Sequence, residues 1–254
     1  MNIEKLNKVA MMQPTFLSWQ GYFELIHKAD TFIFLDDFQY RKRSFHARNR
    51  IFVSKEKIDY AIIPLQRAMH NPNLNQINVL NDCYWLEKFL KRLETYKKTL
   101  YYDQLILPIK NVLAEKSLSL ADYNINIIKL LCNILNINAQ FLLSSQFSIT
   151  TQRSQRIYDL LKECGASCYL CANGSFEYML EDKIFPNEIP VLFQNYQPKP
   201  YKQMHSKEFI PYLSILDALF NVGPEETLNL IQNGTEKWLT WDERHVQFKE
   251  QSYA

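Results

Sequence analysis

Two short apolar segments flank a helix-like segment near the start of this 254-residue chain, and their spacing constrains the fold more than any other feature. Residues 8–13 and 31–36 are short and apolar, as strands require, whereas residues 19–29 place apolar side chains at helical intervals. A strand, a helix and a strand at this spacing are typical of a βαβ unit, whose parallel strands are buried on both faces. The pattern therefore predicts an α/β protein.

The remaining segments continue to alternate between strand and helix patterns. Further strands are expected at 139–144, 167–172 and 189–194, a hairpin at 44–52 and 60–65, and helices at 84–101, 102–136, 152–164 and 215–222. We predict a mostly parallel central sheet with a Rossmann-like core, forming one domain over residues 1–236 with a helical insertion at about 84–136. Residues 237–254 are expected to form a charged C-terminal appendage.

Composition excludes several classes of function. The net charge is only +2, which argues against a protein that binds nucleic acid through its overall field. The sequence contains no apolar run long enough to cross a membrane and no signal-peptide pattern, so a cytoplasmic protein without membrane insertion is expected. The chain also lacks GxGxxG, Walker-type and HExxH motifs, which disfavours dinucleotide-binding, P-loop and zincin functions.

The densest group of chemically active residues follows the second predicted strand. Asp36 and Asp37 stand at its end, where a carboxylate pair could hold Mg²⁺ or provide a general base and its partner. His46 is a further candidate base. The basic residues that follow could grip phosphate, and they are Lys42, Arg43, Arg48 and Arg50. The alternative interpretation is a solvated, salt-bridged hairpin.

Three further groups could complete a substrate site. Gln13 and Tyr22 lie at the first strand-to-helix connection, Asn173, Gly174 and Tyr178 follow the strand at 167–172, and Tyr201, Gln203 and Asp217 lie near the end. The backbone around Gly174 could bind an anion or stabilise an oxyanion, although Asn-Gly is also a plain turn signal. Residues 19–22 match the HIGH-motif nucleotidyltransferases only in placement, because both histidines are missing, and core packing explains them equally well.

Cysteines form a separate candidate group. Cys164, Cys168 and Cys171 have a spacing that invites a zinc hypothesis, but a fourth ligand is missing and the last two occupy an apolar strand. Buried structural thiols are therefore the favoured interpretation, and no metal site is assigned to them. Cys171 remains an alternative nucleophile because it stands at the end of a strand.

Four blocks of sequence carry a resemblance to a known family, and together they span most of residues 9–223. They are MQPTFLSWQGYFELIHKADTFIFLDDFQYRKRSFHARNRI, SSQFSI, GASCYLCANGSFEYM and YKQMHSKEFIPYLSILDALFNVG. The chain resembles the WbqC-like protein family. That resemblance implies a bacterial protein of surface-polysaccharide biosynthesis, notably of the O-antigen of lipopolysaccharide, with a role in attaching an amino acid or acyl group to a sugar. It implies no catalytic mechanism.

The residues and the resemblance together predict a transferase that moves an aminoacyl or acyl group onto an amino sugar or nucleotide sugar. Its expected partners are a nucleotide sugar or sugar-linked substrate and an acyl or aminoacyl donor, which a carrier protein could present. No cofactor is predicted apart from the Mg²⁺ that the Asp pair could hold. Two alternatives stay open: a nucleotidyl or adenylyl transferase on a Rossmann-like core, and a non-catalytic binding subunit of a polysaccharide assembly complex.

Overall fold

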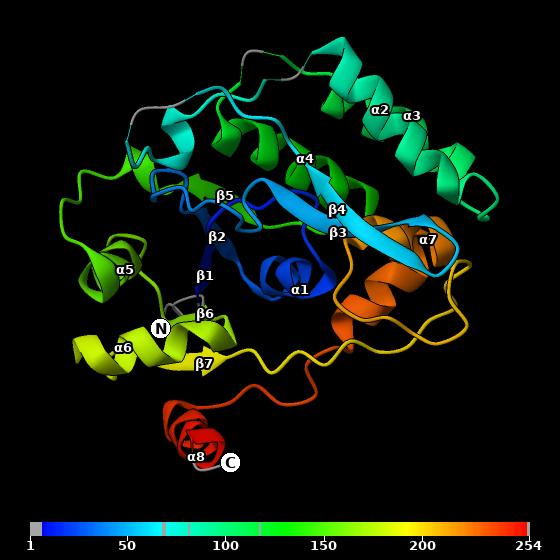
Figure 1. Ribbon diagram of the computed structural model, residues 1–254. Coiled ribbons are helices and arrows are strands. Elements are labelled where there is room, and N and C mark those ends of the chain that lie inside the picture. Colours follow the sequence, from blue (N-terminus) through cyan, green and yellow to red (C-terminus); the bar gives the residue numbers. More distant parts are fainter. Residues whose placement is uncertain (1–6, 68–69, 81, 117, 253–254) are drawn as a thin grey trace.

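A five-stranded parallel sheet forms the centre of the molecule (Figure 1). The computed structural model describes residues 7–67, 70–80, 82–116 and 118–252. The strands lie side by side in the order β5 (Gln140–Leu143), β2 (Thr31–Phe34), β1 (Lys8–Met12), β6 (Cys168–Cys171) and β7 (Val191–Phe193). Every neighbouring pair is parallel. The predicted α/β class with a parallel central sheet is therefore confirmed.

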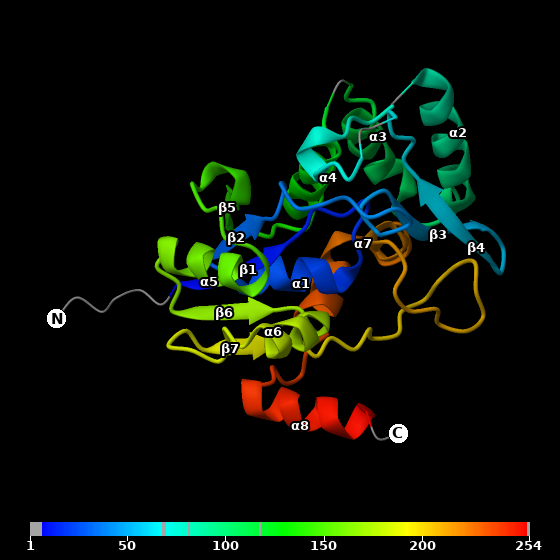
Figure 2. The ribbon, with the colours of Figure 1, turned by 60° about the vertical axis from the view of Figure 1, so that its left-hand side comes forward.

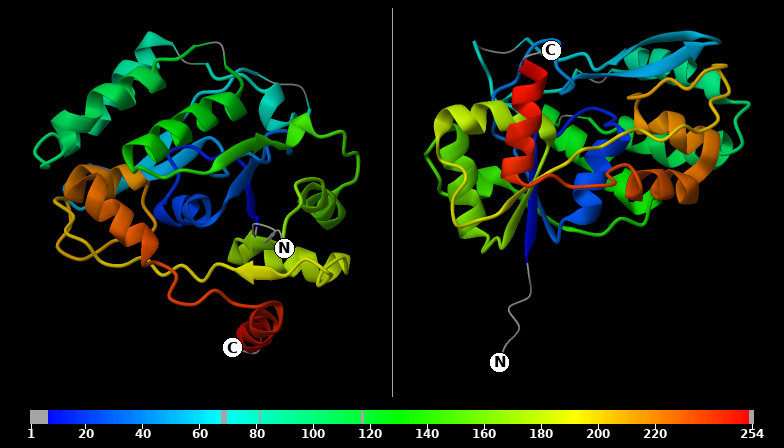
Figure 3. Two further views of the ribbon diagram at one scale, coloured as in Figure 1. Left: turned by 180° about the vertical axis from the view of Figure 1, so that it is seen from behind. Right: turned by 90° about the horizontal axis from the view of Figure 1, so that it is seen from below.

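Helices cover both faces of the sheet, and the strand sequences explain why (Figures 1 and 3). Val9 and Met11 pack into one apolar cluster and Ala10 into the other, because successive side chains of a strand point to opposite faces. One face carries α1 (Gln20–Lys28) and α7 (Ile215–Gln232), and the other carries α5 (Arg153–Glu163) and α6 (Phe176–Asp182). A sheet buried on both sides requires the nearly continuous apolar strands seen in the sequence.

The path of the chain through the sheet creates a switch point. From β1 the chain builds outward through β2 to β5, and then returns to add β6 and β7 on the other side of β1. The carboxyl ends of β1 and β6 therefore face loops that diverge in opposite directions. In open α/β sheets, ligands bind in the crevice at such a position.

A hairpin and a group of helices separate β2 from β5 in the sequence (Figure 2). Strands β3 (Arg48–Ser54) and β4 (Lys57–Ile62) form the expected antiparallel pair. The expected helical region contains α2 (Cys83–Leu93), α3 (Tyr102–Leu113) and α4 (Leu120–Ile134), where the periodicity had predicted only two helices. The separate start of α4 comes from Ser119, whose hydroxyl accepts a hydrogen bond from the Asp122 amide at 3.1 Å.

The charged C-terminal segment folds against the edge of the sheet. Leu239 pairs with Phe193 of β7 through two backbone hydrogen bonds of 2.8 and 2.9 Å. Helix α8 (Trp241–Ser252) follows, and the Trp241 ring lies 5.0 Å from that of Phe176. The segment thus covers an edge strand that would otherwise present unpaired backbone groups. Within the described part of the chain, no helix has the length and apolar character needed to cross a membrane.

Candidate functional site

A cavity of about 700 Å³ opens at the carboxyl edge of the sheet, at the switch point. The ends of β1 and β2 contribute Gln13 and Asp37, the loop after β6 contributes Gly174, and helices α5 and α6 contribute Arg156 and Tyr178. Further polar residues of the wall are Gln39, Arg41, Asn73, Thr151, Gln152, Arg153 and Ser175. The cavity combines segments far apart in the sequence because parallel strands end at one edge of the sheet.

An ion pair between Asp37 and Arg156 stands in the wall of this cavity. Arg156 Nη2 lies 2.5 Å from Asp37 Oδ2, and both side chains are less than one-fifth exposed, at 17% and 18%. Asp37 Oδ1 also accepts a hydrogen bond from the Ser144 hydroxyl at 2.6 Å. Arg156 Nε has no partner among the described residues, so the pair leaves donor capacity on the guanidinium unfilled. Nε is itself buried, but Arg156 lines the cavity, so an anion bound there could contact other N–H groups of its guanidinium.

Asp36 has a different role from its neighbour. Its carboxylate is buried and accepts hydrogen bonds from the Ser144 hydroxyl at 3.1 Å and from the Ser145 amide and hydroxyl at 3.0 and 2.6 Å. These contacts join the end of β2 to the turn after β5. With Asp36 bound to serines and Asp37 bound to Arg156, the two carboxylates do not form the paired oxygen site that Mg²⁺ requires. No group of three or more potential metal ligands occurs in the described residues.

The basic residues of the first block divide into two groups. Arg41, Lys42 and Arg43 are exposed, and none of the three forms an ion pair within the described chain; Arg41 lines the cavity. Arg48 instead lies over the Tyr60 ring, 4.3 Å from its centre, and Arg50 donates hydrogen bonds of 3.0 Å to the carbonyls of residues 211 and 212. The structure does not place Arg43, Arg48 or Arg50 at the cavity, because β3 begins at Arg48 and directs the later residues into the hairpin.

His46 is buried behind the cavity wall. Its Nε2 lies 3.4 Å from Gln13 Oε1, and its Nδ1 has no hydrogen-bond partner in the described part of the chain. Burial, followed by the charge of Arg41, lowers the pKa of His46 to about 4. The imidazole is therefore neutral at neutral pH. It contacts the site through Gln13 and does not line the cavity, which argues against its predicted role as the base that meets the substrate.

The loop after β6 forms one side of the cavity. Asn173–Ser175 is a short 3-10 turn, and the Ser175 amide already donates to the Ala172 carbonyl at 3.0 Å. A side chain at Gly174 would meet no atom within 4 Å, so this glycine faces open space. Burial raises the pKa of Tyr178 to about 12, which keeps its phenol protonated and able to donate a hydrogen bond.

Of the three cysteines of the candidate group, Cys171 is buried, and Cys164 and Cys168 are half-buried. Cys171 is buried in the core and its sulfur lies 3.8 Å from that of Met179. Burial raises the pKa of the Cys171 thiol to about 11 and that of Cys164 also to about 11. A thiol with such a pKa is a poor nucleophile at neutral pH, because the thiolate is the reactive form. The structure thus favours the structural interpretation of these residues.

The first strand-to-helix connection is a packing site. Tyr22 is buried in the core, and its hydroxyl donates to the Gln13 carbonyl at 3.2 Å, which fixes the end of β1. A side chain at Gly21 would lie 2.3 Å from the Trp19 ring, so glycine is required for this close approach. Tyr22 does not line the cavity, although sequence reasoning placed it among the substrate-binding residues. The segment lacks the polar groups that a HIGH-like nucleotidyl site would present.

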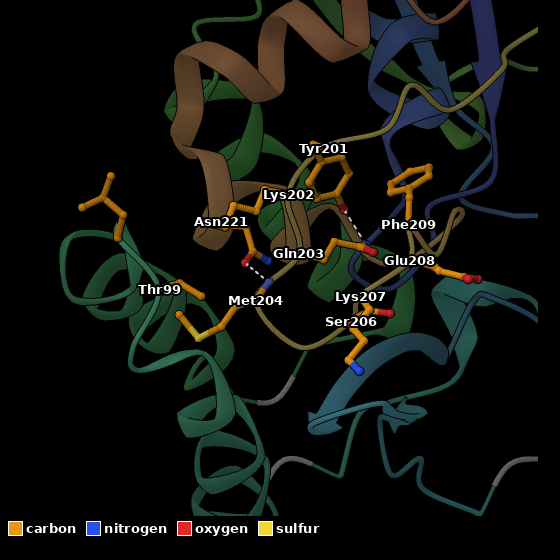
Figure 4. A pocket seen from close by; sticks show the side chains of 11 residues that line it. Thr99, Tyr201, Lys202, Gln203, Met204, Ser206, Lys207, Glu208, Phe209 and Asn221 are labelled. Atoms are coloured by element: carbon orange, nitrogen blue, oxygen red, sulfur yellow. Dashed lines mark hydrogen bonds between the residues drawn. The ribbon is translucent and has the colours of Figure 1, made fainter.

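Tyr201, Gln203 and Asp217 form a separate cluster away from the switch point. Asp217 is buried and accepts hydrogen bonds from the Tyr201 hydroxyl at 2.7 Å and from Gln203 Nε2 at 2.8 Å. Tyr201 and Gln203 also line a different cavity, shown in Figure 4. In the structure they do not line the same cavity as the Gly174 loop. They lie elsewhere because α7 covers the opposite face of the sheet from α5 and α6.

Several lining residues were not identified from the sequence as candidates, and Arg41 and Arg156 matter most for ligand binding. Arg41 begins the Arg-Lys-Arg run, and its proximity to the Asp pair was the available signal. Arg156 carries no local signal, because it is one of several charged residues on an amphipathic helix. Only the packing of α5 beside the end of β2 brings it to Asp37.

Comparisons with known proteins support the same assignment of family. The model of the WbqC-like protein family matches residues 13–229. The uncharacterized protein Rv1507c of Mycobacterium tuberculosis (strain ATCC 25618 / H37Rv) is 28% identical over 226 residues, which cover 87% of this chain and 96% of that protein. No solved structure matches the chain significantly. The family match includes the cavity-lining residues from Gln13 to Tyr178.

Proposed function

Since the chain belongs to the WbqC-like protein family, we propose that it is a cytoplasmic transferase of bacterial surface-polysaccharide biosynthesis. It would move an acyl or aminoacyl group onto the amino group of a nucleotide-linked sugar. The name of the family, which is linked to polysaccharide biosynthesis, supports the pathway. The observation that carries the substrate class is the cavity at the switch point, which is lined by Arg41, Arg153 and Arg156. Arg153 is paired with Glu181 and Asp182, so Arg41 and Arg156 are the arginines assigned to the substrate.

The cavity suits a phosphate-bearing small molecule. Its volume of about 700 Å³ falls within the range that is usual for ligand sites. Arg41 lacks a carboxylate partner in the described chain. The Arg156 guanidinium is paired with Asp37 and lies over the Phe38 ring, 5.4 Å from its centre. Arginine binds phosphate through paired N–H groups, so the two side chains are suited to the diphosphate of a sugar nucleotide.

The remaining polar groups are suited to acyl transfer. In the proposed reaction, the amine nitrogen of the sugar attacks the carbonyl carbon of an activated acyl donor. The bond from that carbon to the donor's leaving atom then breaks, and the leaving group departs with the electron pair. Asp37 would accept the proton that the amine loses and pass it to the leaving group. The Tyr178 hydroxyl and the Gly174 amide would stabilise the negative oxygen that forms during attack.

Binding of sugar nucleotides tests this proposal directly. Isothermal titration calorimetry at low salt with a panel of UDP-, dTDP- and GDP-linked amino sugars should detect at least one ligand. Arg41→Ala should weaken that binding about tenfold, which corresponds to the loss of one charged hydrogen bond. Arg43→Ala is the matched control, since Arg43 is equally exposed and lies outside the cavity. Absence of any ligand, or an equal effect of both substitutions, would contradict the proposal.

A further inference from the structure

A second cavity adjoins the first and shares part of its wall. It has a volume of about 1050 Å³, and both cavities are lined by Gln39 and Arg41. Its other basic lining residues are Lys42, Arg67 and His70, and Tyr40 is a further titratable one. No carboxylate lines it within the described residues, in contrast to the first cavity, where Asp37 balances Arg156.

The backbone that carries these basic side chains is fixed by hydrogen bonds. The Tyr40 amide donates to the Pro72 carbonyl at 2.9 Å, and Gln39 forms an antiparallel bridge with Asn73. On the other side of the cavity, the Gln66 amide donates to the Asn78 carbonyl at 2.9 Å. The cavity thus lies between two segments whose backbones are held in place by hydrogen bonds.

The charge of this cavity is uncompensated. Arg41, Lys42, Arg67 and His70 are all exposed, and none of them forms an ion pair with another described residue. The like charges of Arg41, Lys42 and Arg67 repel one another, and a bound anion would relieve that repulsion. Arg41 stands between the two cavities, so one guanidinium could contact anions on either side.

We propose that the second cavity binds the phosphate-bearing arm of the acyl donor, a phosphopantetheine thioester, while the first cavity holds the sugar nucleotide. This inference rests on the proposed function and names its second substrate. The amine nitrogen attacks the thioester carbonyl carbon, a C–N bond forms and the C–S bond breaks. Sulfur leaves with the electron pair and takes up the proton that the amine loses, so the products are an amide and a free thiol. The thioester end of the donor would pass the shared wall of Gln39 and Arg41 and enter the first cavity, where Asp37, Gly174 and Tyr178 lie.

The test measures two ligands against three variants. Arg67→Ala alters only the second cavity, Arg156→Ala alters only the first, and Arg43→Ala alters neither. The probes are coenzyme A and the same panel of sugar nucleotides, with calorimetry at low salt and a thermal melt to confirm folding. Arg67→Ala should weaken coenzyme A binding about tenfold and leave sugar-nucleotide affinity within about twofold. Arg156→Ala should weaken sugar-nucleotide binding about tenfold and leave coenzyme A affinity within about twofold.

A phosphopantetheine-loaded carrier protein forms a further arm of the experiment, because the arm of the donor could be free or protein-bound. Binding of coenzyme A or of the carrier that depends on Arg67 supports the inference. Binding of neither, or binding that Arg67→Ala and Arg43→Ala change equally, overturns it. If coenzyme A binding depends on Arg67 but no sugar nucleotide binds, the proposed function fails while this site stands. If sugar nucleotides bind through Arg41 and coenzyme A does not bind, only this inference fails.

Discussion

The cavity at the switch point and the cluster around Asp217 each contain polar residues from distant segments, but they differ in how their charges are paired. Asp217 is enclosed and receives hydrogen bonds from the neutral donors Tyr201 and Gln203. In the cavity, by contrast, Arg41 has no carboxylate partner among the described residues. A satisfied buried network fixes a structure, whereas charges left open to solvent can bind a ligand.

Glu24 supports this distinction. It is buried in α1 and accepts hydrogen bonds from Gln194 Nε2 at 2.6 Å and from the Thr235 amide at 2.9 Å. Burial raises the pKa of Glu24 and of Asp217 alike. Each carboxylate connects a helix to a long irregular segment, and the groups that donate hydrogen bonds to it are used within the protein. The two carboxyl groups whose pKa is raised by burial are thus both held by hydrogen bonds within the protein.

The largest effect on stability is expected at Asp217. Asp217→Ala removes the buried acceptor of the Tyr201 hydroxyl and of Gln203 Nε2, and should lower the free energy of unfolding by about 3 kcal/mol. Urea denaturation measures this change. Asp59→Ala is the control, because its ion pair with Arg92 is exposed and should contribute less than about 1 kcal/mol. Equal effects of the two substitutions would show that the hydrogen bonds of Asp217 do not stabilise the fold more than an exposed ion pair does.

His46 should make stability depend on pH. Its pKa is lowered to about 4 in the folded protein, while the unfolded chain has the ordinary value near 6.5. The unfolded state therefore binds the proton first as pH falls. The contribution of His46 to the free energy of unfolding is fully present above about pH 6.5 and is lost as the pH falls toward 4. The loss between pH 6.5 and 5 should be about 2 kcal/mol. Urea denaturation of His46→Gln should lack this loss; an unchanged slope would show that His46 is accessible to solvent.

Asp37 should affect ligand binding more than stability. Asp37→Asn keeps an acceptor for the Ser144 hydroxyl but removes the charge that faces Arg156. The free energy of unfolding should fall by about 1 kcal/mol, since the pair is only partly buried. Turnover in a reconstituted sugar-acylation assay should fall by at least about a hundredfold if Asp37 accepts the proton. Full turnover with normal unfolding would remove Asp37 from the proposed reaction.

The smallest effect on stability is expected at Arg48. This residue tests whether the basic residues of the hairpin differ in function from Arg41. Arg48→Gln removes the guanidinium from the Tyr60 ring and should lower the free energy of unfolding by about 0.5–1 kcal/mol. Affinity for sugar nucleotides should not change, because Arg48 does not line the cavity. Calorimetry on this variant beside Arg41→Ala measures the contrast, and a comparable loss of affinity would contradict it.

The fold could be predicted further from the sequence than the site could. Apolar strands separated by helix-periodic segments reflect burial within a parallel sheet, so β1, α1 and β2 were visible as a unit. The identity of a basic residue did not show what its side chain would contact. Arg41 and Arg48 belong to one basic run, but Arg41 precedes β3 and Arg48 is the first residue of that strand, so their side chains lie in different surroundings. Asp36 and Asp37 likewise differ through contacts with residues more than one hundred positions away. Such pairings depend on tertiary packing, which a single sequence does not encode locally.

The most direct test of the central claim is a crystal structure of the protein soaked with its best-binding sugar nucleotide. The account predicts diphosphate density against Arg41 and Arg156, with the sugar directed toward Gly174 and Tyr178. Density in the separate cavity beside Tyr201 and Gln203, with the switch point empty, would contradict it.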